Sequence, residues 1–235
     1  MDGVLCDSEL PSRHAAVALF DQFYNVSVSA DDFSPFTGTG EANFLAGVAA
    51  LYRVPAFDPD EAKARFFDIY TSREYIADLA PFPGVVSLVQ RVKALGLKVA
   101  VASAADRVKV DANLNAIGLP PETFNFITSS DFIPNKKPAP DVFLAAANGL
   151  NVRPDRCVVI EDAIAGVQAA KAAGMRCIAV STSLPSDLLE KEAPDVIRGE
   201  PALIEIRDIF GEDIFENLDL DRLAGKAPTS AQEQA

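Results

Sequence analysis

The chain has few of the side chains on which nucleophilic hydrolases and disulfide-rich proteins depend. Its 235 residues contain one histidine, His14, and three cysteines, Cys6, Cys157 and Cys177. A single histidine leaves almost no material for a Ser–His–Asp or Cys–His apparatus. Three cysteines, an odd and sparse number, argue against a disulfide framework and favour a reducing compartment.

Positive charge and long apolar runs are also scarce. Lys and Arg total 21 against 34 Asp and Glu, which gives a formal net charge of −13. This balance argues against nucleic acid as a partner. Apolar runs such as 97–102 are interrupted by charge within a few residues, so the sequence predicts no membrane span. A small phosphorylated metabolite remains a compatible partner, because a metal ion and a few local cations can reverse the field inside a cleft.

What the sequence does contain is an alternation of short β-branched runs with longer amphipathic stretches. This alternation predicts right-handed βαβ crossovers and an α/β fold, a Rossmann-like parallel sheet with helices on both faces. The predicted strands are residues 99–103, 126–129, 157–160 and 177–180. The predicted helices are residues 85–96, 108–118, 141–149 and 163–174.

The first eighty residues follow a different pattern. Residues 11–76 are helical in pattern, with breaks near 34–40 and 55–59, and Phe66, Phe67 and Tyr70 fall on one helical face. We therefore expect three segments. They are an α/β core of residues 1–10 and 79–210, an inserted helical cap of residues 11–78, and an acidic, low-complexity tail of residues 211–235 that is disordered.

Chemically useful side chains stand where the predicted strands end. In open parallel sheets, ligands bind at the carboxyl ends of the strands. An acid, a hydroxyl, a lysine and an acidic pair occupy such positions here, a set suited to phosphoryl transfer. They are Asp2 followed by Gly3, Ser103, Lys137, and the pair Glu161 and Asp162.

These motifs resemble those of the haloacid dehalogenase superfamily, in particular its branch of β-phosphoglucomutase-like phosphatases with a helical cap. The resemblance covers residues 1 to about 210, and its most specific parts are residues 137–143, 159–163 and 166–170. Segments 36–42 and 102–107 are similar to a phosphatase-like domain of a larger chloroplast protein. The resemblance implies Mg2+-dependent hydrolysis of small phosphomonoesters through an aspartyl phosphate. It also implies the chloroplast stroma as the location, with the cytoplasm as the alternative.

The resemblance assigns a role to most of these residues. Asp2, the second acid of Asp-x-Asp-Gly, protonates the departing alcohol and then activates water. Ser103 donates its hydroxyl to the phosphoryl oxygens, together with main-chain N–H groups at Gly3 and Ala104. Lys137 neutralises charge on the transferred group.

Several of these assignments have a competing reading. Lys136 lies beside Lys137, but the Pro-x-Pro that follows Lys137 gives a stiff loop and favours Lys137. Arg13 is a candidate for substrate binding, whereas for its neighbour His14 we favour a structural role over a catalytic one.

The acidic pair predicts the metal site. Adjacent carboxylates at the end of a buried strand cost energy unless a cation compensates them, which favours Mg2+. We expect Asp162 to be a direct ligand and Glu161 to act through water, with Asp2 in the same metal set. The alternatives are that Asp162 is a helix N-cap and that Glu161 complements the helix dipole.

The chain departs from the family pattern in two places. Met1 occupies the x of Asp-x-Asp-Gly, so the nucleophilic Asp would stand immediately before it. We therefore expect the chain as given to be inactive. The alternative function is a catalytically inactive regulatory or binding module of a larger protein. In the cap, Glu41 stands where mutases of this branch carry an arginine for a second phosphate, which favours simple monoester hydrolysis.

Overall fold

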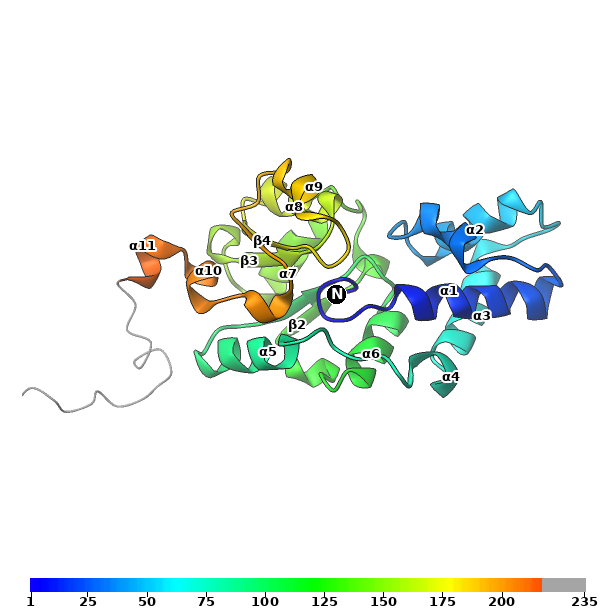
Figure 1. Ribbon diagram of the computed structural model, residues 1–235, viewed down its shortest axis with the longest axis horizontal. Coiled ribbons are helices and arrows are strands. Elements are labelled where there is room, and N and C mark those ends of the chain that lie inside the picture. Colours follow the sequence, from blue (N-terminus) through cyan, green and yellow to red (C-terminus); the bar gives the residue numbers. More distant parts are fainter. Residues whose placement is uncertain (217–235) are drawn as a thin grey trace, which may run out of the picture.

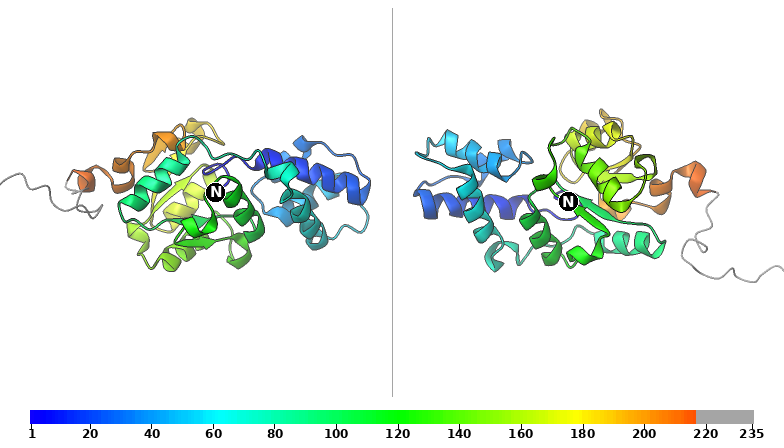
Figure 2. Two further views of the ribbon diagram at one scale, coloured as in Figure 1. Left: turned by 90° about the horizontal axis from the view of Figure 1, so that it is seen from below. Right: turned by 180° about the vertical axis from the view of Figure 1, so that it is seen from behind.

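The computed structural model describes residues 1–216, in which a helical part lies beside an α/β part (Figures 1 and 2). Residues 9–76, called the cap below, lie to one side of the strands. α1 contacts α3, and α2 packs on α3 as well. The cap helices are α1 (Glu9–Leu19), α2 (Glu41–Leu51), α3 (Pro59–Tyr70) and α4 (Arg73–Ile76), with a π-helical turn (Phe20–Tyr24) and a 3-10 helix (Ala30–Phe36) between α1 and α2.

Local signals explain where the cap helices begin and end. Asp58 caps α3, since its carboxylate accepts the N–H groups of Asp60 and Glu61 at 2.9 and 3.1 Å. The chain leaves helix at Asn25, whose φ of 52° is left-handed. This break was not predicted, because only the breaks near residues 34–40 and 55–59 carry glycine or proline.

The α/β part contains only parallel strand pairs among the described residues. β1 (Ala100–Ala102) pairs with β2 (Phe126–Thr128), and β3 (Val158–Glu161), β4 (Arg176–Val180) and β5 (Val196–Arg198) form a second sheet in that order. Its helices are α5 (Val85–Ala94), α6 (Arg107–Ala116), α7 (Asp141–Leu150), α8 (Ile164–Ala172), α9 (Ser186–Glu190), α10 (Ile206–Phe210) and α11 (Glu212–Phe215). The predicted α/β class, with parallel strands and many helices, is confirmed.

The strands divide into two sheets where one was predicted. No ladder joins β1 to β3 within residues 1–216, and the first residues curl into turns instead of extending. Gly3, at a φ of +72°, donates its N–H to the carbonyl of Cys6 at 2.9 Å. This turn still contributes to the interior, since Met1 packs in the cluster of Val101 and Val4 in that of Ile178.

Two further differences concern the end of the described chain. β5 was not predicted, because three residues without a long apolar run carry little strand signal. Residues 212–215 form α11, where we expected the disordered tail to begin; residues 217–235 of that tail lie outside the described part. In residues 1–216, no helix combines the length and the apolar character needed to cross a bilayer.

The cysteines carry no disulfide within the described part. All three thiols are free; Cys6 and Cys177 are buried, and Cys157 is partly exposed.

Candidate active site

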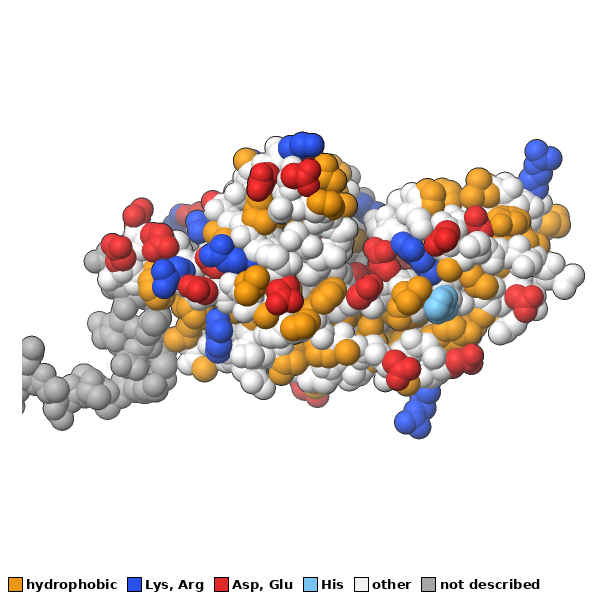
Figure 3. Space-filling model, in the orientation of Figure 1, with side chains coloured by type: hydrophobic (Ala, Val, Ile, Leu, Met, Phe, Trp, Pro, Cys, Tyr) orange, Lys and Arg blue, Asp and Glu red, His pale blue; other side chains and the backbone are white. Residues whose placement is uncertain are grey.

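A cavity of about 410 Å³ is lined by residues of both the cap and the α/β part. Figure 3 shows acidic side chains gathered on one face near this junction. His14 lines a different hollow, on the cap beside Tyr75. Every residue that the sequence singled out for the site lines the larger cavity, namely Asp2, Gly3, Arg13, Ser103, Ala104, Lys137, Glu161 and Asp162.

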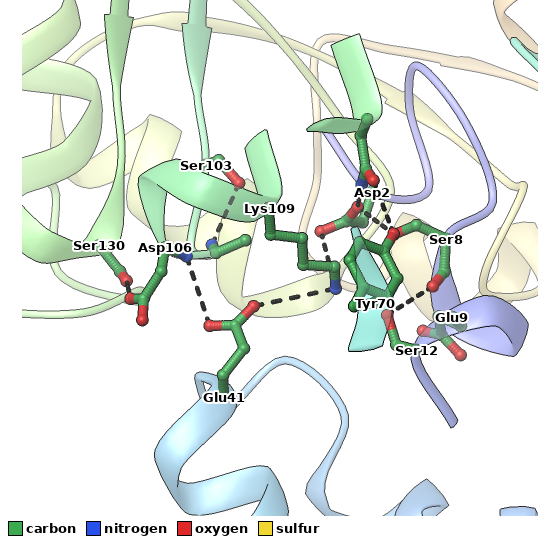
Figure 4. Close-up of polar contacts among 12 residues, drawn as sticks. Asp2, Ser8, Glu9, Ser12, Glu41, Tyr70, Ser103, Asp106, Lys109 and Ser130 are labelled. Carbon is green, nitrogen blue, oxygen red and sulfur yellow. Dashed lines mark hydrogen bonds and ion pairs between the residues drawn. The ribbon is translucent and has the colours of Figure 1, made fainter. Parts of the chain in front are cut away.

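Asp2 is held by contacts on both carboxylate oxygens (Figure 4). Its Oδ1 accepts hydrogen bonds from the Ser8 hydroxyl and from Asn113 Nδ2, the latter at 3.3 Å. Lys109 Nζ lies 3.9 Å from its Oδ2. Burial by itself would raise the pKa of Asp2, but the Lys109 ammonium, the charged amino terminus of Met1 and the two hydrogen bonds together outweigh it, so the pKa is lowered. Asp2 is therefore an ionised, oriented carboxylate.

Gly3 brings the turn of Asp2 against the end of β3. A methyl group at Gly3 would fall 1.9 Å from Oδ2 of Asp162, a distance that no side chain tolerates. Together with its positive φ, this contact explains why glycine follows Asp2. Thr182 ties the same turn to the loop after β4, because its hydroxyl donates to the Gly3 carbonyl.

Ser103 follows β1 directly and is buried. Its N–H donates to the Thr128 carbonyl at 3.1 Å, which continues the β1–β2 ladder by one residue. Its hydroxyl oxygen accepts the N–H of Ala105 at 3.1 Å. The hydroxyl thus lies at the turn between β1 and α6, where its proton remains available to a bound oxygen.

Lys137 and Glu161 form a buried ion pair. The Lys137 ammonium donates to Glu161 Oε1 and lies 4.8 Å from the centre of the Phe143 ring. Burial would raise the pKa of Glu161, but Lys137 and the Ala163 N–H outweigh that cost and lower the pKa. Lys136 instead extends toward the cap, where its Nζ would lie 2.5 Å from a Cβ at Gly40.

The negative charge of Asp162 is poorly balanced by the groups around it. Burial, and then the adjacent Glu161 charge, raise the pKa of Asp162 to about 6, against the opposing effect of a bond from Ser183. A buried oxygen donor of this kind fits a hard cation such as Mg2+. The site has fewer candidate ligands than a complete metal site would need. Residues 1–216 contain no group of three or more His, Cys, Asp or Glu side chains arranged to hold a metal ion.

Several polar residues in contact with Asp2, or one contact further away, were not predicted, and of these Lys109 lines the cavity. Lys109 and Asn113 contact Asp2, and Tyr70 donates its hydroxyl to Asn113 Oδ1 at 2.6 Å. The signal available in the sequence was a polar stripe, since Asp106, Lys109 and Asn113 share one face of α6. The apolar periodicity of the same helix masked it.

Parallel strands flanked by helices, with a helical cap over a polar cavity at the strand ends, define a capped, Rossmann-like α/β fold. Comparison with known proteins gives the family. A model described as haloacid dehalogenase-like hydrolase matches residues 1–180, and the chain belongs to this family. The resemblance inferred from the sequence motifs is thereby confirmed.

Two relatives are similar in sequence. The chain is 54% identical over 220 residues to protein SUPPRESSOR OF QUENCHING 1, chloroplastic, of Arabidopsis thaliana, covering 92% of this chain and 21% of that protein. It is 34% identical over 148 residues to the bifunctional riboflavin kinase/FMN phosphatase of the same plant, covering 63% of this chain and 38% of that protein. The chain thus spans only a fifth to two fifths of the length of these relatives.

A solved structure shares the fold. CbbY from Rhodobacter sphaeroides, crystallised in complex with phosphate, superposes with a TM-score of 0.76 at 24% identity, covering 89% of this chain and 96% of that one. At this identity the likeness establishes the fold alone. The fold and the family together place the chain among the haloacid dehalogenase-like hydrolases.

Proposed function

We propose that this chain provides the cap and most of the active site of a Mg2+-dependent phosphatase that acts on small phosphomonoesters. One observation carries the proposal: Asp2, Ser103, Lys137 and Asp162, which are far apart in sequence, line one cavity under the cap. Family membership supports the same class of reaction.

The proposed roles follow from the contacts of each group. Ser103 and the nearby main-chain N–H groups of Gly3 and Ala104 bind the phosphoryl oxygens. Lys137, already directed into the cavity by Glu161, neutralises charge on the transferred group. Arg13 has a buried Nε–H without a partner among residues 1–216, and a substrate oxygen would satisfy it.

Asp2 serves as the acid and base of the reaction. In the first step the protonated form of Asp2 donates its proton to the departing alkoxide. In the second step the resulting carboxylate takes a proton from the water that attacks the aspartyl phosphate, which regenerates the protonated form for the next cycle. In the family motif Asp-x-Asp-Gly, the first acid forms this intermediate, and Met1 of this chain occupies the x. The lowered pKa of Asp2 suits the second step, in which the ionised form is needed.

Asp162 is the proposed direct ligand of Mg2+, and Glu161 acts on the ion through water because Lys137 already pairs with it. Asp2 was also expected among the metal ligands. Both Asp2 side-chain oxygens already have protein contacts, so we assign its carboxylate to proton transfer. When bound, the ion supplies charge neutralisation between the nucleophile and the phosphoryl group.

The substrate is proposed to be a phosphorylated metabolite with one reacting phosphoryl group. A variant of CbbY from Rhodobacter sphaeroides has been crystallised with xylulose-1,5-bisphosphate, which shows the kind of ligand that this fold accepts. In this chain the cap presents Glu41, whose negative charge disfavours a second phosphate at that place. The name of the first relative suggests a chloroplast location within a larger protein.

The test compares three proteins in the hydrolysis of p-nitrophenyl phosphate with Mg2+. They are the printed chain, the chain preceded by an apolar strand ending in Asp, and the same extension ending in Asn. We expect Mg2+-dependent turnover only with Asp at the added position. Equal turnover by the Asn form, after removal of contaminating phosphatase, would disprove the proposed chemistry. Absence of turnover by all three would favour a binding module.

A further inference from the structure

One face of α6 carries three polar side chains that are almost completely buried, of which Figure 4 labels Asp106 and Lys109. Asp106 stands at the N-cap, and Lys109 and Asn113 follow at helical spacing, so all three face the same side. Their exposures are 8%, 9% and 0%. Burial of this much polarity is costly unless each group has a partner, which makes the partners informative. We call these three residues the α6 polar face.

The cap supplies one set of partners. Glu41, at the start of α2, accepts the N–H of Asp106 at 3.3 Å through Oε2, and its Oε1 lies 3.9 Å from Lys109 Nζ. Tyr70, at the end of α3, donates its hydroxyl to Asn113 at 2.6 Å. The Tyr70 ring also lies 5.6 Å from Lys109 Nζ. Both cap residues are themselves buried, at 7% and 0% exposure.

Asp2 is the partner on the other side. Lys109 Nζ is 3.9 Å from Asp2 Oδ2, and Asn113 Nδ2 donates to Asp2 Oδ1 at 3.3 Å. Lys109 and Asn113 each therefore join a cap residue to the same carboxylate. The cap and the proposed acid and base are connected through α6 by two independent chains of contact.

We propose that Lys109 and Asn113 are positioning residues, which align the Asp2 carboxylate with the leaving-group oxygen and do so fully only while Glu41 and Tyr70 of the cap are docked on α6. This inference rests on the proposed function of the site. It adds two residues, and a dependence on the cap, that none of the site motifs contains.

The Asp2 side chain depends on contacts from α6 to hold its orientation. Asp2 belongs to a tight turn with few ladder hydrogen bonds, so its side chain needs external contacts to stay in place. A carboxylate transfers a proton efficiently only within hydrogen-bonding distance of the reacting oxygen. If the cap moved away from α6, Lys109 would lose its contact with Glu41 and Asn113 would lose its hydrogen bond from Tyr70. Asp2 would then be held less firmly, and proton transfer between Asp2 and the substrate would become slower.

The test uses the chain with the added Asp and two substrates that differ in their need for a proton. p-Nitrophenyl phosphate has a leaving group that departs without protonation, whereas glycerol phosphate releases an alkoxide that requires an acid. For Lys109→Met and for the nearly isosteric Tyr70→Phe, we expect kcat/KM, which reports the first transfer step, to fall on glycerol phosphate by about 100-fold and about 10-fold, with less than about 3-fold loss of kcat/KM on p-nitrophenyl phosphate. Lys109→Arg should recover most of the loss.

Controls separate positioning from damage to the fold. Lys98→Met removes a lysine that bonds the Leu150 carbonyl away from the cavity, and it should change neither rate. If Lys109→Met does not fold, the double variant Lys109→Met/Glu41→Gln removes the opposing charge as well and should show the same selective loss.

The outcomes discriminate between the two proposals. Equal losses on both substrates would show that the α6 polar face is only structural and would overturn this inference. If the extended parent hydrolyses neither substrate, the proposed function itself fails.

Discussion

The cap and the α/β part are built on different packing principles. All eight ring–ring contacts found among residues 1–216 join residues between Phe20 and Tyr70, so they belong to the cap. The clusters of the α/β part consist mainly of valine, alanine and leucine. Helices that pack only on helices leave gaps that large rings fill, whereas helices that lie on a sheet need small contact residues.

This difference in packing explains why the proposed catalytic carboxylates lie in the α/β part and not in the cap. Close packing on β3 is visible at Gly166 of α8, where a methyl group would fall 2.0 Å from the Glu161 side chain. Such an environment fixes buried carboxylates, whose neighbours cannot move aside. The cap contributes Glu41 and Tyr70 at its edge, and its aromatic interior supports them from behind. The following experiments test this division, from the largest expected effect to the smallest.

The largest effect should come from the end of β3. We expect Asp162→Asn, in the chain with the added Asp, to reduce Mg2+-dependent turnover by about 1000-fold or more, because it removes the proposed metal ligand. Glu161→Gln should cost about 10- to 100-fold, as for a group that acts through water. Steady-state assays over a range of Mg2+ concentrations measure both. Full activity of the Asp162→Asn variant would reduce Asp162 to a structural residue.

The free energy of unfolding of core variants should differ between the cap, which is packed with aromatic rings, and the α/β part. Phe66 in the cap and Ile178 in β4 are both fully buried. Phe66→Ala leaves a large cavity among rings and should lower the free energy of unfolding by about 3–5 kcal/mol, whereas Ile178→Val should cost about 0.5–1.5 kcal/mol. Urea denaturation followed by circular dichroism gives both values. A comparable loss for the two variants would contradict the view that the cap depends on its rings.

The raised pKa of Asp162 predicts a pH effect on stability without metal. Between the ordinary value of 3.8 and about 6, the folded chain keeps a proton that the unfolded chain has lost. The contribution of Asp162 to the free energy of unfolding should therefore fall as pH rises from about 4 to about 6 and then level off. Asp162→Asn should abolish this fall and be more stable than the parent at neutral pH, by roughly 1–3 kcal/mol.

The matched control for this experiment is Asp187→Asn, at an exposed position of α9. Thermal denaturation in chelator across this pH range measures the effect. A curve for Asp162→Asn that runs parallel to that of the parent would show that the buried charge is compensated within the fold.

The smallest effect concerns the ion pair between Lys63 of the cap and Asp106 of α6. Its atoms lie 2.9 Å apart, and the Lys63 side chain is 29% exposed. Lys63→Met should destabilise the chain by less than about 1 kcal/mol, and less in high salt, because the Lys63 end of the pair is open to water and salt. Paired denaturation curves at low and high salt measure this. A larger loss than for Tyr70→Phe would mean that surface charge, and not the buried contacts on α6, holds the cap.

Much of the fold and of the proposed site was predictable because the signals are local. Strand runs such as 157–160 and 177–180 agree with β3 and β4 to within one residue at either end. The strand-end residues Ser103 and Asp162 could be singled out because parallel strands bring their carboxyl ends to one edge whatever the details of packing. The family followed from short motifs for the same reason.

The tertiary structure decided what depends on contacts between distant segments. The division into two sheets follows from how residues 1–6 fold against both halves of the interior, and no local pattern encodes it. The pairing of Lys137 with Glu161 leaves Lys136 directed toward Gly40.

The α6 polar face is the clearest case. In sequence, Lys109 is one charged residue in an ordinary amphipathic helix. Only the docked cap converts it into a buried cation between Asp2 and Glu41, because burial raises the energetic cost of an unpaired charge and so fixes which partners it takes.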